Sequence, residues 1–264
     1  MCATCGCSEG ATPRVAGAHD HASDDRAHSH DQDHSVPHLH AGPSRTVLLE
    51  QDVLAKNNRL AGRNRAWFAS RGIRALNLMS SPGAGKTTLL ERTIERLCGR
   101  VTVSVIEGDQ ETLRDAERIR GAGARAVQIN TGSGCHLDAA MVADALRTLD
   151  PPRGSLLFIE NVGNLVCPAL FDLGEGPRVV ITSVTEGEDK PLKYPHMFRA
   201  CDVLVLNKVD LLPHVQFDRQ RFFEYVRKVN PRLQTFQLSA TRRDGLDEWC
   251  SWLVERNAPQ ADAH

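Results

Sequence analysis

The chain of 264 residues carries 32 basic and 33 acidic side chains, a net charge of -1, and a hydrophobic content of 41%. This length and apolar content suit one large α/β domain or two small ones with a sizeable core, and the near-neutral charge argues against a general nucleic-acid binder. No apolar run approaches the roughly 20 residues of a membrane helix, and the start lacks the pattern of a secretory signal, so we expect a cytoplasmic protein. In that compartment its eight cysteines predict thiols or metal ligands rather than a disulfide framework.

The first 43 residues differ in composition from the rest. They hold seven of the eleven histidines, six acidic residues against two arginines, and few large apolar residues. Burial could not offset the cost of ordering such a backbone, so we expect a disordered metal-binding arm over 1–43 and a folded domain over 44–264. At its start, Cys2, Cys5 and Cys7 place three thiols close together, and thiolates suit nickel, copper or zinc. A redox C-x-x-C is the alternative, but such motifs work on a folded domain.

From residue 44 the sequence alternates between helical and extended patterns. Apolar residues between Val47 and Leu60 recur at helical spacing, which predicts an amphipathic helix, and Arg71-Gly72 then breaks the chain. Strands alternating with helices predict an α/β fold with a mostly parallel sheet and helices on both faces. The expected strands cover 75–79, 101–106, 126–129, 155–159, 179–184, 203–206 and 235–238.

A small-residue loop, Ser80 to Thr87, follows the first expected strand and opens an expected helix over 88–98. It matches the phosphate-binding pattern G-x-x-x-x-G-K-[ST], except that Ser80 stands in place of the leading glycine. In such loops the backbone N–H groups surround a phosphate, the lysine reaches the β and γ oxygens, and the last hydroxyl binds Mg²⁺. A tight turn with an incidental lysine is the alternative. We expect a P-loop NTPase domain that binds nucleotide through Gly83, Ala84, Gly85, Lys86, Thr87 and Thr88.

Two carboxylates end expected strands at one edge of the sheet. Asp109 comes after the strand over 101–106, and Glu160 comes directly after the strand over 155–159. Open α/β folds bind ligands at this edge, so we expect both to hold Mg²⁺ with Thr87, directly or through water, or to orient the attacking water. With Lys86 they form the candidate catalytic set. A solvated acid at a strand end is the alternative, and it is strongest for Glu107.

Cys135, His136 and Cys167 supply a second set of possible metal ligands. For any one cysteine of the domain, a buried thiol acting as a small hydrophobic residue is the simpler interpretation. Their loop context raises Cys135 and Cys167 above Cys98, Cys201 and Cys250. Because Cys167 lies seven residues after Glu160, a metal bound there would sit on the segment that senses the γ-phosphate, which predicts coupling between the two sites.

The strand over 203–206 ends in Asn207-Lys208-Val209-Asp210, which matches the N-K-x-D pattern of GTPases. The carboxylate of Asp210 can accept two hydrogen bonds from guanine, and the stem of Lys208 can lie over the base. Ser239 and Ala240 follow at the end of the next expected strand. We therefore expect guanine nucleotide, GTP or GDP, with an ATP-binding relative as the alternative.

Together these motifs resemble the HypB family, the nickel-incorporation GTPases of [NiFe]-hydrogenase maturation. The resemblance covers nearly the whole chain, and Ser80 also fits that family. It implies a dimerising P-loop metallochaperone that works with a HypA-like nickel-binding accessory protein. It implies nickel at Cys2, Cys5 and Cys7, and nickel or zinc at Cys135, His136 and Cys167. The motifs that carry it are Cys2-x-x-Cys5-x-Cys7, the histidine-rich arm, Ser80–Thr87, Asn130–Asp138, Glu160–Pro168 and Asn207–Asp210.

The expected mechanism is a slow GTP-operated switch. Hydrolysis would change the Cys167 segment and so control nickel delivery to a hydrogenase large-subunit precursor, without membrane or nucleic-acid partners. We expect a homodimer promoted by GTP or metal, with Leu211, Leu212 and Val215 as candidate interface residues. One rival is a UreG-like urease GTPase, which the amino-terminal cysteines and the Cys135 context disfavour. The other is a nickel storage protein that acts mainly through the arm.

Overall fold

The structure, a computed structural model, describes residues 45–109 and 114–255. Among the described residues, those from Asp52 to Glu255 belong to one compact unit. The expected arm over 1–43, including Cys2, Cys5 and Cys7, lies outside the described residues, so it stays a prediction. The helices are α1 Arg45–Arg71, α2 Lys86–Leu97, α3 Arg114–Gly121, α4 Ala139–Leu149, α5 Lys190–Lys193, α6 Pro195–Ala200, α7 Arg219–Val229 and α8 Leu246–Glu255, with short 3₁₀ helices η1 Cys167–Ala169 and η2 Val209–His214.

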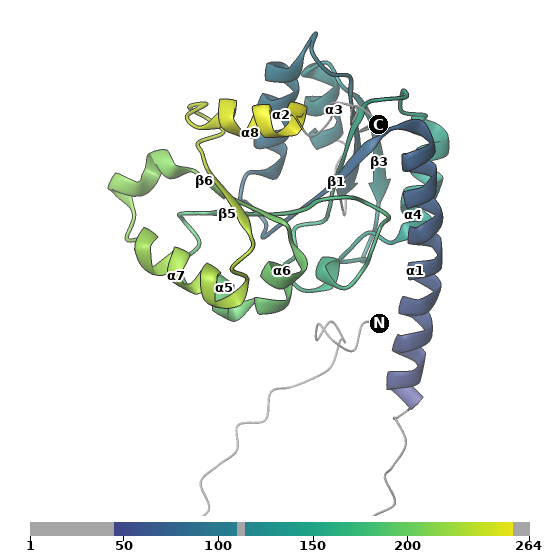
Figure 1. The fold of residues 1–264 in the computed structure, drawn as a ribbon, viewed down its shortest axis with the longest axis horizontal. Helices are drawn as coiled ribbons and strands as arrows, with labels where there is room; N and C mark the ends of the chain where they lie inside the picture. Colours follow the sequence, from purple (N-terminus) through teal and green to yellow (C-terminus); the bar gives the residue numbers. More distant parts are fainter. Residues whose placement is uncertain (1–44, 110–113, 256–264) are drawn as a thin grey trace, which may run out of the picture. The chain divides into compact units, whose positions relative to one another are not determined.

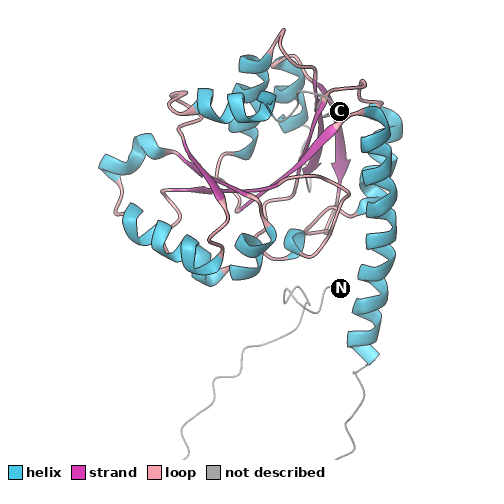
Figure 2. Ribbon diagram, viewed as in Figure 1, coloured by secondary structure: helices cyan, strands magenta, loops and turns pink. Residues whose placement is uncertain are grey.

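The described strands form one parallel sheet in the order β3-β2-β4-β1-β5-β6-β7. Parallel strands need crossover connections, and helices supply them on both faces (Figures 1 and 2). The expected α/β P-loop architecture is therefore confirmed. The strands are β1 Arg74–Ser80, β2 Val103–Asp109, β3 Arg125–Asn130, β4 Leu156–Glu160, β5 Arg178–Ser183, β6 Val203–Asn207 and β7 Gln234–Gln237.

Alternation along the strands divides the core between the two faces of the sheet. Leu76 and Phe158 face the cluster packed against α2, α3 and α8, where Trp249 is buried. Their neighbours Ala75 and Leu157 face the opposite cluster, with Phe68 of α1 and α4. On the same side α6 and α7 cover β5 and β6. Both faces of the central strands are therefore buried, which explains why these strands read as largely apolar runs, whereas the edge strands β3 and β7 are partly exposed.

Two element bounds differ from expectation in ways that matter for the site. The second strand continues to Asp109 instead of ending at 106. Glu107 pairs with both β3 and β4, and Gly108 pairs with β3. Helix α2 begins at Lys86, two residues before the expected start, so the lysine itself lies in the first turn. Among the described residues, no helix is both long and apolar enough to cross a membrane.

Candidate functional site

The phosphate-binding loop connects β1 to α2 and depends on two glycines with positive φ. Gly83 has φ 74° and Gly85 has φ 95°, a region that side chains with a Cβ rarely adopt. A Cβ on Gly85 would also lie 2.6 Å from Asn207 Nδ2. Lys86 Nζ donates to Ser80 Oγ at 2.9 Å, so the residue that replaces the leading glycine holds the lysine at the loop.

The N-K-x-D segment is bonded directly to this loop. Asn207 Nδ2 donates to Ala84 O at 2.9 Å, and Lys208 Nζ donates to Gly83 O at 2.7 Å. Asn207 Oδ1 accepts from the backbone N–H of Ala240 at 3.1 Å. The two predicted nucleotide-binding segments therefore meet as one unit. Asp210 is half-buried in η2, and it lies outside the cleft described below, as do Ser239 and Ala240.

Around Thr87 the structure gathers four carboxylates. Thr87 Oγ1 donates to Glu160 Oε1 at 2.8 Å and to Asp115 Oδ2 at 3.1 Å. Glu107 and Asp109 line the same cleft from β2. Hard oxygen ligands of this kind are the set that Mg²⁺ takes. Glu160 Oε2 is buried and has no hydrogen-bond partner among the described atoms, so this oxygen fits a cation.

Burial and mutual repulsion perturb two of these acids. Burial, together with the charges of Glu160, Asp109 and Asp115, raises the pKa of Glu107 from its ordinary value to about 8. Burial also raises the pKa of Glu160, against the opposing effects of Lys86 and the Thr87 hydrogen bond. A cation would relieve both groups, because it offsets the desolvation and the like-charge repulsion.

These segments enclose a cleft of about 530 Å³ at the carboxyl ends of the strands. That is the place where open α/β sheets bind ligands. Arg118 of α3 also lines the cleft, donating to Thr88 Oγ1 at 3.3 Å and to Glu91 Oε2 at 2.7 Å. Lys190 donates to Ser81 Oγ at 3.1 Å. Two cationic side chains beside the loop add to its fit for an anionic ligand.

Cys135, His136 and Cys167 come together as the sequence predicted. Their sulfur atoms and one His136 ring nitrogen all lie within 4.8 Å of one another. Two thiolates on one tetrahedral zinc would be roughly 3.8 Å apart at bond lengths of about 2.3 Å, so only a small closing movement separates this cluster from a ligand set. Cys167 is buried at the start of η1. Burial lowers the pKa of His136, against the opposing effect of Asp138, so the ring favours the neutral form that binds metals.

The other cysteines divide differently. Cys201 and Cys250 are buried in apolar clusters, and burial raises the pKa of both thiols, that of Cys250 to about 11. These two match the interpretation of small hydrophobic residues. Cys98 does not, because it is exposed at the end of α2.

One buried side chain connects the cluster with the nucleotide cleft. Asn161, directly after Glu160, accepts on Oδ1 from the backbone N–H of Val162 at 3.0 Å and from that of Leu137 at 3.2 Å. Leu137 follows His136 in sequence. A second amide, Asn164, donates from Nδ2 to Cys135 O at 3.3 Å. The segment that follows Glu160 is therefore bonded to the loop that carries two of the three cluster residues.

Sequence reasoning missed several of these groups. Asp115 and Arg118 lie on α3, in a stretch with no motif to single them out, and only the fold brings α3 to Thr87. Glu107 was left out of the candidate set, and a solvated acid was a stronger alternative for it than for Asp109 or Glu160. Its side chain is only 2% exposed, because β2 extends through this residue. Asn161 lies inside the Glu160–Pro168 motif, but nothing in the sequence indicates that its side chain accepts a hydrogen bond from Leu137.

The comparisons with known proteins agree on one family. Residues 74–237 match the model of the CobW/HypB/UreG nucleotide-binding domain. The hydrogenase maturation factor HypB of Azotobacter vinelandii is 51% identical over all of this chain and 95% of its own length. The crystal structure of the maturation factor HypB from Archaeoglobus fulgidus superposes with a TM-score of 0.72 at 42% identity, covering 77% of this chain and 99% of that one. The structure of HypB from Helicobacter pylori in complex with nickel has the same TM-score at 38% identity, over 76% and 95% of the two chains.

Proposed function

The chain belongs to the HypB hydrogenase maturation factors within the CobW/HypB/UreG family, and from this premise we propose that it is a GTP-hydrolysing nickel metallochaperone. In this proposal it binds Ni²⁺ and delivers it for [NiFe]-hydrogenase maturation, and the nucleotide state controls the transfer. The observation that carries the proposal is the contact from Asn161 to Leu137, which joins the nucleotide cleft to the Cys135–His136–Cys167 cluster.

The nucleotide half of the proposal follows from the loop chemistry. The amides of Gly83 to Thr88 and the Lys86 ammonium bind the phosphates, while Asn207, Lys208 and Asp210, with Ser239 and Ala240, bind guanine. Thr87, Glu160 and Asp109 would hold Mg²⁺, with Asp115 as a further oxygen beside Thr87. The ion would neutralise charge that develops on the phosphate oxygens. We expect slow intrinsic turnover, because a switch must remain in the GTP-bound state for some time and no arginine finger is identifiable from the sequence.

The metal half of the proposal assigns two roles. The arm, through Cys2, Cys5 and Cys7, would hold nickel most tightly, and the cluster at Cys135, His136 and Cys167 would hold nickel or zinc under nucleotide control. Two thiolates and one imidazole give three ligands against the usual four. We therefore propose that a homodimer, promoted by GTP or metal, shares or flanks this site.

Coupling would follow from the geometry of the 160–167 segment. In this proposal Glu160 and Asn161 change their contacts when the γ-phosphate leaves. The change reaches the metal cluster by two routes, through the hydrogen bond of Asn161 with Leu137 and through Cys167, which lies in the same segment. A metal whose ligand set is complete in only one arrangement must favour one nucleotide state. The dependence is mutual, because binding free energies are linked. The proposed partners are a HypA-like accessory protein and the hydrogenase large-subunit precursor, in the cytoplasm.

The test compares the full chain with a variant lacking residues 1–43. Truncation should lower the nickel stoichiometry by several equivalents while GTP hydrolysis continues at nearly the same rate. Changing Cys2, Cys5 and Cys7 together to Ala should remove the tightest nickel site alone. A full chain that binds nickel but hydrolyses no GTP would leave a storage protein as the function.

Dimerisation supplies an independent check on the internal cluster. Cys167→Ala should abolish the metal dependence of the dimer, measured by light scattering, while the metal-free variant still binds GTP. Cys250→Ala is the matched control, since that thiol is also buried but lies on α8, among apolar side chains of the core. If both variants dimerise with metal as the wild type does, the cluster takes no part in assembly.

A further inference from the structure

The internal cluster lies between two segments that are remote in sequence. One is the loop of Cys135 and His136, which leads through Leu137 into Ala139 at the start of α4. The other carries Phe171, whose ring stacks on the His136 imidazole with centroids 3.9 Å apart and planes inclined by 27°. This stack restricts the orientation of the imidazole, so the distance between the two segments decides where its nitrogens point.

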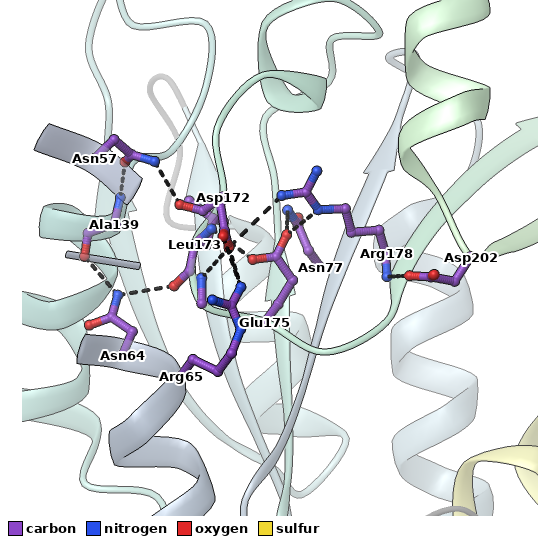
Figure 3. Close-up of polar contacts among 11 residues, drawn as sticks. Asn57, Asn64, Arg65, Asn77, Ala139, Asp172, Leu173, Glu175, Arg178 and Asp202 are labelled. Carbon is purple, nitrogen blue, oxygen red and sulfur yellow. Dashed lines mark hydrogen bonds and ion pairs between the residues drawn. The ribbon is translucent and has the colours of Figure 1, made fainter. Parts of the chain in front are cut away.

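Helix α1 is bonded to both segments through two buried amides (Figure 3). Asn64, 4% exposed, donates from Nδ2 to Ala139 O at 2.9 Å and to Leu173 O at 3.0 Å. Asn57, 5% exposed, accepts on Oδ1 from the backbone N–H of Ala139 at 2.9 Å and donates to Asp172 O at 2.8 Å. Each amide thus joins the His136 segment to the Phe171 segment.

Two further contacts bring the Phe171 segment against α1. Arg65 Nη2 lies 2.8 Å from both carboxylate oxygens of Asp172. Gly174 has φ 91°, and a Cβ there would lie 2.5 Å from Ala61 O. The backbone of this segment therefore runs in close contact with the helix, at a distance that only glycine allows.

Apolar packing alone does not account for the two amides. Phe68 already packs α1 against α4 and the sheet, and Ala61 is fully buried, whereas a buried amide stabilises only if its partners satisfy it. Because the acceptors are backbone atoms of two defined residues, the amides fix position in a way that apolar contacts do not.

We propose that Asn57 and Asn64 are positioning residues for the internal metal cluster: α1 holds the two segments together so that the Phe171 stack presents His136 to the two thiolates. The inference rests on the proposed binding of metal at Cys135, His136 and Cys167. It makes α1, the helix that leads directly from the arm, a structural determinant of metal affinity.

The test uses Co²⁺ in the full chain with Cys2, Cys5 and Cys7 changed to Ala, because thiolate-to-cobalt absorption reports the ligand set directly. Asn64→Ala should weaken Co²⁺ binding by about tenfold or more, within the range for residues that orient metal ligands, and alter the absorption spectrum. GDP affinity should stay within about twofold.

The matched control is Asn230→Ala. Asn230 Nδ2 also donates to two backbone carbonyls, Phe198 O at 3.0 Å and Cys201 O at 3.1 Å, but packs with α6 and α7. This variant should lose stability and leave the Co²⁺ spectrum unchanged. Asn57→Ala gives a second test should Asn64→Ala not fold, with a metal affinity lowered in the same direction.

Phe171→Ala provides the link to the mechanism. If the amides act through the stack, Asn64→Ala adds little to the loss of Co²⁺ affinity already caused by Phe171→Ala. Wild-type Co²⁺ affinity and spectrum in folded Asn64→Ala and Asn57→Ala proteins would overturn the inference. Absence of thiolate-to-cobalt absorption in the unaltered cluster would instead overturn the proposed metal site itself.

Discussion

Asn161→Ala tests the connection between the two sites at its narrowest point. The side chain is 1% exposed, and its oxygen is the acceptor for both Leu137 N and Val162 N. Alanine removes that acceptor and leaves the ligands of the cluster and the groups around Thr87 in place. We expect the metal cluster and the nucleotide cleft each to bind their ligand, but no longer to influence each other.

The magnitude follows from the groups left without partners. A buried amide N–H without an acceptor costs about 1–3 kcal/mol, so two such groups predict a loss of roughly 2–6 kcal/mol in the free energy of unfolding. Most of that range lies below the stability of a typical domain, about 5–15 kcal/mol, so the variant should fold. Coupling free energies are commonly about 1–3 kcal/mol. We expect the effect of nucleotide on metal affinity to fall below about twofold.

The assay is a Co²⁺ titration of the variant with GDP and with a non-hydrolysable GTP analogue, and unfolding in urea gives the stability. Asn77→Ala is the matched control: its Oδ1 accepts from Asn161 Nδ2 at 3.3 Å, and it is 0% exposed. Losing Asn77 costs stability but keeps the bond to Leu137, so coupling should survive. Coupling that persists in Asn161→Ala, or is lost equally in both variants, would refute the proposed route.

Three further outcomes follow from the site. Gly85→Ala should weaken GDP binding by more than about tenfold, measured with a fluorescent analogue, because its Cβ would contact Asn207 at 2.6 Å. Gly83→Ala should weaken GDP binding less, because the space around that position is open. A larger loss of GDP affinity in Gly83→Ala would be inconsistent with this loop geometry. Asp210→Asn should lower GTP affinity by about 1.5–3 kcal/mol and let xanthosine triphosphate compete better, and unchanged GTP affinity would exclude this segment from base recognition. The pKa of Glu107 is raised from 4.5 to about 8, so between these values the folded state holds a proton that the unfolded chain has released. Without metal or nucleotide, this group therefore lowers the free energy of unfolding as pH rises from 5 to 8. Glu107→Gln should gain stability over the wild type along that range in urea unfolding, and parallel curves would contradict the shift.

Local patterns were sufficient for the sheet and for the two nucleotide motifs. Runs such as 203–206 are apolar because both faces of the sheet are covered. The position of Ser80–Thr87 between an expected strand and an expected helix identified it as a phosphate-binding loop. The joining of Cys135 to Cys167 also followed from their loop context and the resemblance to HypB. In these cases the residues that carry the signal are adjacent in sequence, or form a known combination.

Contacts between remote segments were beyond reach. The apolar pattern between Val47 and Leu60 predicted a helix but not its buried face. Helix α1 buries Asn57, Ala61, Asn64 and Phe68 at helical spacing, whereas Val53 is 50% exposed. The two polar residues conceal that buried face from an apolar pattern. Asp115 comes to Thr87 only because α3 packs beside α2. Such pairings depend on tertiary packing, which single-sequence periodicity does not encode.

Nucleotide control of metal binding is tested at its centre by the nickel affinity of the Cys135–His136–Cys167 cluster in two nucleotide states. It is measured by isothermal titration of the variant lacking residues 1–43, so that the cysteines and histidines of the arm bind no nickel, in Mg²⁺ with GDP or with a GTP analogue. If nucleotide controls metal binding, the dissociation constants differ by about fivefold or more. Equal nickel affinity in both states would contradict that control and leave the cluster a structural metal site.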